Sequence, residues 1–292
     1  MKASLRAMAS NRRFWRGMAS IAVFLALWEI GSRSEQWMAA DVFAPLRDLV
    51  LAMGFKKPYL PWIGAVPAPS AVLASWLKVV DDPSYWQSWY MSFFRVMSGF
   101  VAAMLVGIPF GLLLAVNRTA YGIGFPAFEV LRPIPPLAWV PASIIFWPTQ
   151  ELAISFITFL GAFYTIVINV LGGARSIDSR YFQAAQSMGA SRWDVFRRII
   201  LPGTLPSIVV GAAVGMGITW EVVVAAEMIS GGGSQVGGTS GGGLGFFIWS
   251  SYIGGSYEQI VVGMISIGVA GYASSELLRW AGHYVTPWMR LR

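Results

Sequence analysis

The chain has 292 residues, of which 56% are hydrophobic and only 12% are charged, and its mean hydropathy is +0.60. Soluble domains carry roughly 25% charged residues and disordered chains are poor in apolar residues, so this composition predicts an integral membrane protein. The sequence contains no cysteine and one histidine, His283. These counts exclude a disulfide-stapled scaffold, thiolate metal sites and any motif with two histidine ligands.

The net charge of +7 comes from basic residues that collect mostly between the apolar stretches, with Arg95 and Arg132 as exceptions. A nucleic-acid-binding protein would instead gather its basic residues on one face of a soluble domain. The distribution therefore indicates membrane topology, and we expect no nucleic-acid partner.

Six stretches approach the ~20 apolar residues that a membrane helix needs. They are 17–32, 91–116, 121–147, 152–171, 204–229 and 260–278. Cytoplasmic termini place most basic residues on the inner side, as the positive-inside rule requires. We therefore expect an all-α membrane protein with six transmembrane helices and both termini in the cytoplasm. The first stretch is short and follows a basic prefix, so a signal peptide is an alternative for it.

This topology divides the chain into four parts. They are a cytoplasmic tail (1–16), a first transmembrane helix (17–32), an external segment (33–90) and a five-helix core (91–292) with a cytoplasmic loop at 172–203. Arg95 lies one turn inside the second span, and we expect its side chain to snorkel to the interface.

The third stretch is unusual because prolines interrupt it at positions 126, 133, 135, 136 and 141. Each interior proline removes a backbone hydrogen bond, and such a backbone is tolerated at membrane depth only within protein or along a cavity. We expect either a kinked packing helix or a segment that lines a pathway. Arg132 favours the pathway, although Glu129, one turn earlier, is placed to neutralise it.

The loop 172–203 has the pattern of two short helices joined by a hinge. Residues 181–188 favour a helix that Gly189 ends in the left-handed conformation. Ser191 then begins a second helix as N-cap, with Asp194 three residues later, and we expect Pro202 to stop this helix after 192–200. By pattern alone, such an elbow is either an interfacial membrane helix or a docking element for a soluble partner.

The residue spacing in this loop resembles the EAA loop of ABC-importer permeases. The matching residues are Gln183-Ala184-Ala185, Gly189, Ile199 and Leu201-Pro202. Trp220 and the segments 67–76 (PAPSAVLASW), 131–140 (LRPIPPLAWV), 225–229 (AAEMI) and 244–249 (LGFFIW) are similar to the nitrate, sulfonate, taurine and bicarbonate branch of that family. The likeness covers about residues 92–282.

Three features depart from the family pattern. Gln183 replaces the glutamate that begins the loop motif, which removes any salt bridge made from that position. Glu221 follows Trp220 where the branch usually has an apolar residue. The glycine-rich segment 230–245 is longer than the expected turn, and we expect a flexible external insertion there.

The resemblance implies a type I ABC importer permease fold and a permease subunit without its own ATPase. The sequence agrees with this, because the phosphate-loop pattern GxxxxGK[ST] is absent from the chain. It implies that the ATPase-coupling residues are Gln183, Ala184, Ala185, Gly189, Ala190, Leu201 and Pro202. It also implies a second copy of the chain, two ATP-binding subunits that hold ATP and Mg, and a periplasmic or lipid-anchored substrate-binding protein. The complex would lie among the lipids of the bacterial inner membrane.

The implied function is ATP-driven import of a small anion of the nitrate, sulfonate, taurine or bicarbonate type by alternating access. Candidates for lining or gating the pathway are Arg132, Trp220, Glu221 and Glu227, with structural packing as the alternative for each. No metal site is expected. An ATP-independent channel or carrier is a second class, and an intramembrane enzyme is disfavoured because the spans contain no paired aspartates or Ser-His arrangement.

Overall fold

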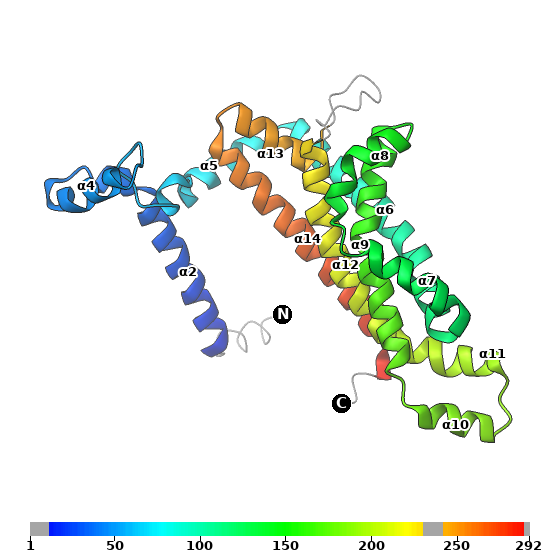
Figure 1. Ribbon diagram of the computed structural model, residues 1–292. Coiled ribbons are helices and arrows are strands. Elements are labelled where there is room, and N and C mark those ends of the chain that lie inside the picture. Colours follow the sequence, from blue (N-terminus) through cyan, green and yellow to red (C-terminus); the bar gives the residue numbers. More distant parts are fainter. Residues whose placement is uncertain (1–11, 230–241, 289–292) are drawn as a thin grey trace. The chain divides into compact units, whose positions relative to one another are not determined.

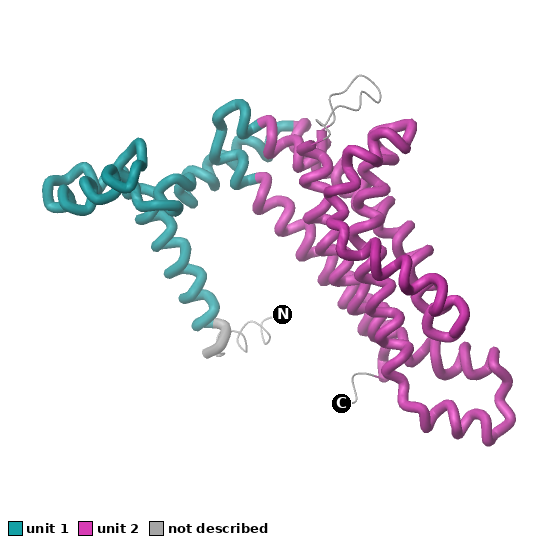
Figure 2. The backbone as a smooth tube through the Cα atoms, viewed as in Figure 1, with its two compact units in different colours: residues 1–82, 251–262 teal, residues 83–250, 263–292 magenta. Residues whose placement is uncertain are grey.

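The computed structural model describes residues 12–229 and 242–288. The predicted tail 1–16 and the glycine-rich segment 230–245 therefore lie largely outside the described residues. Every regular element within these ranges is a helix, which confirms the all-α fold class. The chain forms two compact units, residues 1–82 with 251–262 and residues 83–250 with 263–292 (Figure 2).

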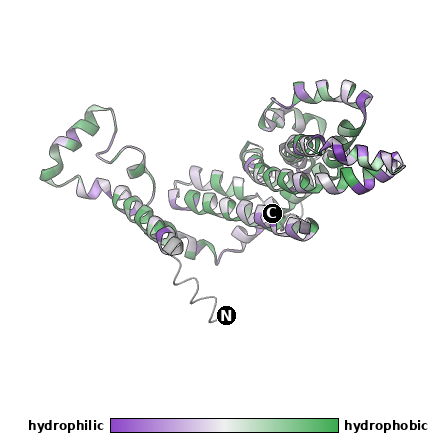
Figure 3. Ribbon diagram, turned by 90° about the horizontal axis from the view of Figure 1, so that it is seen from below, coloured by the Kyte–Doolittle hydropathy of each residue, from purple (hydrophilic) through white to green (hydrophobic). Residues whose placement is uncertain are grey.

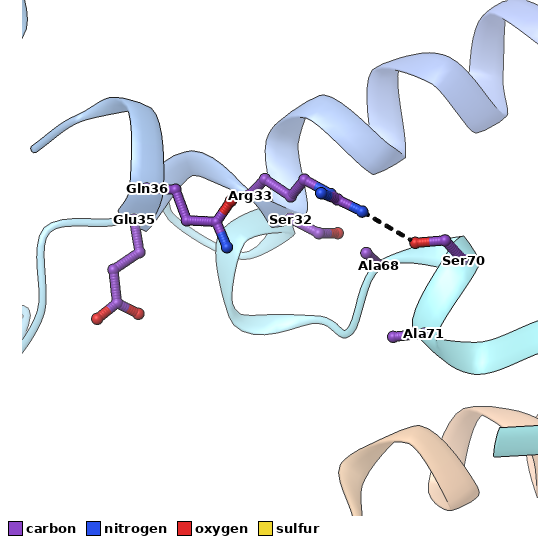
Figure 4. A pocket seen from close by; sticks show the side chains of 7 residues that line it. All are labelled: Ser32, Arg33, Glu35, Gln36, Ala68, Ser70 and Ala71. Atoms are coloured by element: carbon purple, nitrogen blue, oxygen red, sulfur yellow. Dashed lines mark hydrogen bonds between the residues drawn. The ribbon is translucent and has the colours of Figure 1, made fainter. Parts of the chain in front are cut away.

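The first unit contains one long helix followed by short ones. Its elements are α2 (Arg12–Ser32), α3 (Ser34–Trp37), η1 (Asp41–Phe43), α4 (Ala44–Ala52), η2 (Ile63–Ala65) and α5 (Pro69–Val79). The end of α2 is joined to the start of α5, because Glu29 accepts hydrogen bonds from the backbone nitrogen and the hydroxyl of Ser70, at 3.1 and 2.8 Å. Arg33 also donates to the Ser70 hydroxyl (Figure 4). Glu29 thus satisfies a backbone donor in the first turn of α5, as an N-cap side chain would.

The second unit is a helical bundle. Its elements are α6 (Pro83–Val116), α7 (Arg118–Leu131), η3 (Pro136–Trp139), α8 (Val140–Phe146), α9 (Gln150–Arg175), α10 (Ser179–Ser187), α11 (Arg192–Val195), the π-helical turn η4 (Phe196–Ile200) and α12 (Leu201–Ile229). Helices α13 (Leu244–Ile253) and α14 (Tyr257–Val285) have residues in both units. Figure 1 shows α10 and α11 at the opposite end of this unit from α8.

Four helices among the described residues are long and apolar enough to cross a membrane: 83–116, 150–175, 192–229 and 257–285. They include the second, fourth, fifth and sixth predicted spans. The first and third predicted spans, which correspond to α2 and to α7 with α8, are not among them. Figure 3 shows hydrophobic residues along α2 and along the long helices of the second unit.

The third predicted span is not one helix. Helix α7 ends at Leu131, and the chain resumes helical structure only at η3 and α8. The physical reason is the pair Pro135-Pro136, because a residue that precedes proline is pushed from helical into extended backbone; Pro135 has ψ 136°. The segment is therefore divided into α7, η3 and α8 and does not form a single kinked helix.

Helices α6, α9 and α12 form the core of the second unit, with α9 packed against both of the others. Close approach between α6 and α9 depends on Gly99. A Cβ atom at this position would lie 2.7 Å from the backbone nitrogen of Phe159 and would overlap the hydroxyl of Thr158. Small residues at such contacts let membrane helices gain van der Waals contact along their backbones.

Candidate functional site

The loop between α9 and α12 folds into the predicted elbow. Helix α10 begins after Asp178, whose side chain accepts a hydrogen bond from the Arg180 backbone nitrogen at 2.9 Å. The Arg180 guanidinium also donates to this carboxylate, and these hydrogen bonds lower the pKa of Asp178 from its ordinary value of 3.8. The N-terminus of the elbow is therefore fixed by an ionised carboxylate at physiological pH.

Gly189 ends α10 in the left-handed conformation, with φ +74°, which confirms its predicted role as a helix cap. The backbone nitrogen of Gly189 donates to Gln186 and that of Ala190 donates to Ala185, each at 3.0 Å. This pair of bonds is the Schellman motif, which satisfies the last carbonyl groups of the helix while the chain turns. The hinge geometry thus requires glycine, because glycine has no Cβ atom and adopts positive φ without steric strain.

The second helix of the elbow starts as predicted and ends differently. Ser191 and Asp194 form a capping box: the Asp194 nitrogen donates to the Ser191 hydroxyl at 3.1 Å, and the Ser191 nitrogen donates to the Asp194 carboxylate at 3.3 Å. The helix was expected to stop at Pro202, and this expectation is wrong, because residues 192–229 are continuously helical. The π-helical turn at 196–200 directly precedes Pro202, and such a widened turn accommodates the missing proline N–H.

The residues of the family motif lie on different sides of the elbow. Gln183, Ala184 and Gly189 are exposed, whereas Leu201 and Pro202 are half-buried. Ala185 is buried within this chain, so its small size serves packing inside the elbow and it does not face an external partner.

Large apolar side chains are also exposed on the elbow. Tyr181, Met188 and Trp193 are 63%, 81% and 66% exposed, and the Trp193 ring stacks on Phe196. A cluster of this kind on a short helical protrusion is typical of a protein contact surface.

A groove of about 690 Å³ separates the elbow from the ends of α6 and α9. Its lining residues are Ala115, Val116, Ala174, Phe182, Gln186, Ala190, Arg192, Trp193, Val195, Phe196 and Ile200. Ala190, one of the predicted coupling residues, therefore faces the groove between the elbow and the bundle.

Arg132 lies at the break between α7 and η3, beside a cavity of about 300 Å³. Its lining residues are Arg132, Pro136, Leu160, Gly161, Tyr164, Thr165, Ile168 and Ile218. The irregular backbone thus borders a cavity, as a backbone with missing hydrogen bonds requires. Arg132 also pairs with Glu129 at 2.8 Å, as the spacing of the two residues predicts.

The other pathway candidates are placed differently from one another. Trp220 is buried, and its indole nitrogen donates to Ser274 of α14 at 3.0 Å. Glu221 is exposed on α12, three residues after Ile218, which lines the Arg132 cavity. Because Glu221 is exposed, structural packing within this chain, the alternative given for it, does not describe this residue.

Glu227 belongs to a buried ionic network that also contains Arg95. The Arg95 guanidinium donates to Glu151 at 2.5 and 2.7 Å and to Glu227 at 2.9 Å. Ser92 donates to Glu227 at 2.8 Å, and the backbone nitrogen of Gly245, in the first turn of α13, donates to it at 2.9 Å. The network, which we call the Arg95 network, connects α6, α9, α12 and the N-terminus of α13.

Arg95 does not snorkel to the interface as expected, because its side chain is fully buried and paired. Sequence reasoning missed this network. A signal was present in the topology: Arg95, Glu151 and Glu227 all fall at the outer ends of their predicted spans, and buried charges require partners. Within the described ranges, no cluster of three His, Asp or Glu side chains that could hold a metal ion is found.

Comparison with known proteins places these features in context. Residues 107–291 match the family model described as "Binding-protein-dependent transport system inner membrane component". The chain is 32% identical over 284 residues to the taurine transport system permease protein TauC of Escherichia coli K12, covering 96% of this chain and 94% of TauC. It is 34% identical over 207 residues to the nitrate import permease protein NrtB of Leptolyngbya laminosa, covering 71% of each chain.

A third relative and a solved structure agree with this likeness. The chain is 31% identical over 276 residues to the bicarbonate transport system permease protein CmpB of Synechococcus elongatus, covering 92% of this chain and 88% of CmpB. Its fold is similar to a chain in the crystal structure of a bacterial ABC transporter involved in the import of alginate. That match has a TM-score of 0.55 at 16% identity and covers 94% of this chain and 100% of that chain.

Proposed function

We propose that the elbow of this chain couples a separate ATPase to transport. The chain belongs to the binding-protein-dependent transport system inner membrane components. It falls in the ABC importer branch whose relatives are named for nitrate, taurine and bicarbonate. The chain is a permease subunit of an ABC importer, and ATP hydrolysis belongs to another subunit of such a complex.

The single observation that carries the coupling proposal is the elbow around Gly189. Its left-handed hinge and its capping box fix two helices at an angle, and they present exposed Tyr181, Met188 and Trp193 at one end of the unit. We assign Gln183, Ala184 and Gly189 to the ATPase contact and Leu201 and Pro202 to the junction with α12. Because α11 continues into α12, a force on the elbow reaches the core helix directly. Gln183 contacts the ATPase by neutral hydrogen bonds, since it cannot form the salt bridge of a glutamate.

The exposed acidic residue on α12 supports assembly as a homodimer. Glu221 lies on a helix long and apolar enough to span the membrane, and an ionisable side chain there is costly unless it faces a polar route or a partner. We propose that two copies of the chain enclose the pathway and that Arg132 and Glu221 line it. Trp220 and Glu227 are buried inside one chain and position α12 for this role.

The topology of the complex follows from the same proposal. Helix α2 and the broken pair α7 and α8 complete six spans in the bacterial inner membrane, with both termini and the elbow in the cytoplasm. Two ATPase subunits hold ATP and Mg, a substrate-binding protein docks outside, and ATP-driven closure moves the elbows between two states of the permease pair.

We propose a small anion as the substrate. The relatives named for taurine, nitrate and bicarbonate carry solutes that contain an anionic group. Arg132 places a guanidinium beside the cavity at the break of the third span, and a guanidinium recognises such oxyanions by paired hydrogen bonds.

The test is the variant Gly189→Val in the complex with its ATPase. A β-branched side chain at φ +74° costs about 1–3 kcal/mol of backbone strain, so the hinge must change its conformation. We expect loss of ATPase co-purification and of ATP-driven anion uptake in proteoliposomes. Gly189→Asn is expected to restore both, because asparagine tolerates the left-handed region.

The matched control is Gly172→Val, at a helical glycine near the same loop where an added Cβ meets open space. It should keep the ATPase bound. An intact complex and normal uptake for Gly189→Val would overturn the coupling proposal, and uptake by the purified chain without ATP would identify an ATP-independent carrier.

A further inference from the structure

Helix α2 exposes apolar side chains around its circumference. Ile21, Val23, Phe24, Leu27 and Ile30 are each between 58% and 63% exposed, and Met18 and Leu25, on the opposite side of the helix, are 48% and 42% exposed. At 100° per residue these positions point in different directions around the axis. A helix that is apolar on every side requires lipid or protein around it.

The end of α2 is firmly joined to the segment that follows it. The Trp37 indole donates to the Ile30 carbonyl of α2 at 2.9 Å, and within the segment the Leu60 backbone nitrogen donates at 2.9 Å to the buried hydroxyl of Ser34, two residues past the end of α2. Ser70, at the start of α5, donates to Glu29 near the end of α2, and Figure 4 shows the bond from Arg33 to Ser70. The segment 33–66, which we call the cap, is therefore held at the end of α2, and Figure 1 shows α4 extending away from that end.

This cap presents an apolar stripe outward. Val42, Leu46, Leu49 and Met53 follow one another at spacings of four, three and four residues, which places them on one face of α4 and its flanking turns. Val42, Leu49 and Met53 are 85%, 57% and 63% exposed, whereas Leu46 is half-buried and Val50, four residues after it, is buried within the unit. Helix α4 thus packs against its own unit through Val50 and the edge of the stripe at Leu46, and it leaves the rest of the stripe uncovered.

A strained turn adds an exposed indole to the same segment. Trp62 has φ 65° and ψ −63°, and the Ile63 nitrogen donates to the Pro61 carbonyl at 2.9 Å. These values define a γ-turn with positive φ, a strained conformation for a residue with a side chain. The turn leaves Trp62 87% exposed, and tryptophan is enriched where membrane meets water.

We propose that the stripe on α4 and Trp62 lie in the outer interface of the lipid bilayer, with the axis of α4 parallel to the membrane plane. The inference rests on the proposed topology, in which α2 spans the membrane and Ser32 lies at its outer end. Lipid is the occupant because the cap directly follows the end of α2 that this topology places at the outer interface, and because an exposed tryptophan is typical of that interface. Lys56, exposed beside Met53, is placed to contact lipid phosphates.

The absence of cysteine makes site-specific labelling direct. We would introduce Leu49→Cys and Met53→Cys in the full chain, assembled with its partners in vesicles of phosphatidylethanolamine and phosphatidylglycerol, and attach a nitroxide spin label. The control is Asp48→Cys, an exposed position on a different face of the same helix. Collisions with oxygen, which dissolves in lipid, are compared with collisions with a water-soluble nickel chelate.

Labels at 49 and 53 are expected to show several-fold less nickel accessibility and more oxygen accessibility than the label at 48. Trp62→Gly relieves the positive-φ strain, so the fold is expected to persist while the label at 53 shifts toward water. Equal nickel accessibility at the three positions would overturn the proposal. Protection that appears only after the substrate-binding protein is added would also overturn it and identify a protein docking surface.

ATP-driven uptake is measured in the same vesicles. Water-exposed labels in a transporting complex refute only the membrane contact of α4, whereas lipid-protected labels in a complex that does not transport refute the proposed function.

Discussion

Replacing Arg95 with methionine is expected to destabilise the protein far more than the loss of an exposed ion pair. Arg95 is fully buried and donates to Glu151 at 2.5 and 2.7 Å and to Glu227 at 2.9 Å. Methionine has a similar length and keeps most of the packing, so the change removes chiefly the positive charge. Among the described residues, Glu227, itself fully buried, then retains only uncharged donors, from Ser92 and Gly245.

The size of the effect follows from this burial. Removing one partner of a buried ion pair costs about 3–5 kcal/mol, because the remaining charge is left uncompensated away from water. Exposed ion pairs contribute only about 0–1 kcal/mol to the free energy of unfolding. The matched control is therefore Arg279→Met, which breaks a half-exposed pair with Glu276 at 3.3 Å.

Thermal unfolding of the purified chain in detergent, followed by circular dichroism, measures the difference. We expect Arg95→Met to lower the apparent Tm on the order of 10 °C and Arg279→Met to change it little. Adding Glu227→Gln to Arg95→Met removes the orphaned charge and is expected to recover part of the loss. Equal shifts for Arg95→Met and Arg279→Met, or a double variant as unstable as the sum of its two single changes, would refute the reasoning.

Three further changes test other parts of the structure. Gly99→Leu is expected to prevent α6 from approaching Phe159 of α9 and to yield aggregated protein in size-exclusion chromatography, whereas a stable monodisperse product would contradict the close approach. Ser191→Ala removes one half of the capping box and should destabilise the elbow by about 1 kcal/mol, seen as faster proteolysis there; unchanged cleavage would exclude this contribution. The lowered pKa of Asp178 predicts that its stabilisation of α10 is complete above the ordinary value of 3.8 and is lost as the pH falls through the lower folded value. The protection factor of the Arg180 amide, its intrinsic hydrogen-exchange rate divided by the observed rate at the same pH, should fall over that acidic range, and Asp178→Asn should abolish this change in protection.

Local chemistry let the elbow be predicted from the sequence. Gly189 at the end of a helical pattern and Ser191 three residues before Asp194 each act on backbone groups a few residues away, so their geometry is encoded where they stand. The long apolar stretches likewise predicted the helices of the core, because a membrane admits few other structures for them.

The end of the second elbow helix could not be predicted in the same way. Pro202 is a helix breaker by its local chemistry, yet residues 192–229 remain helical around a π-turn. Buried residues follow it on α12, such as Thr204 and Ile208, and their packing favours a continuous helix over the local preference of proline.

The amino-acid sequence by itself determined the class of this protein, its long core helices and the hinge and capping box of its elbow, since each depends on composition or on neighbours along the chain. The tertiary structure decided the partners of Arg95, Trp220 and Glu227, because residues far apart in sequence meet only when α6, α9, α12 and α14 pack. It also decided that Glu221 is exposed while Glu227 is buried, since a helix that is apolar nearly all round does not reveal which face its neighbours cover.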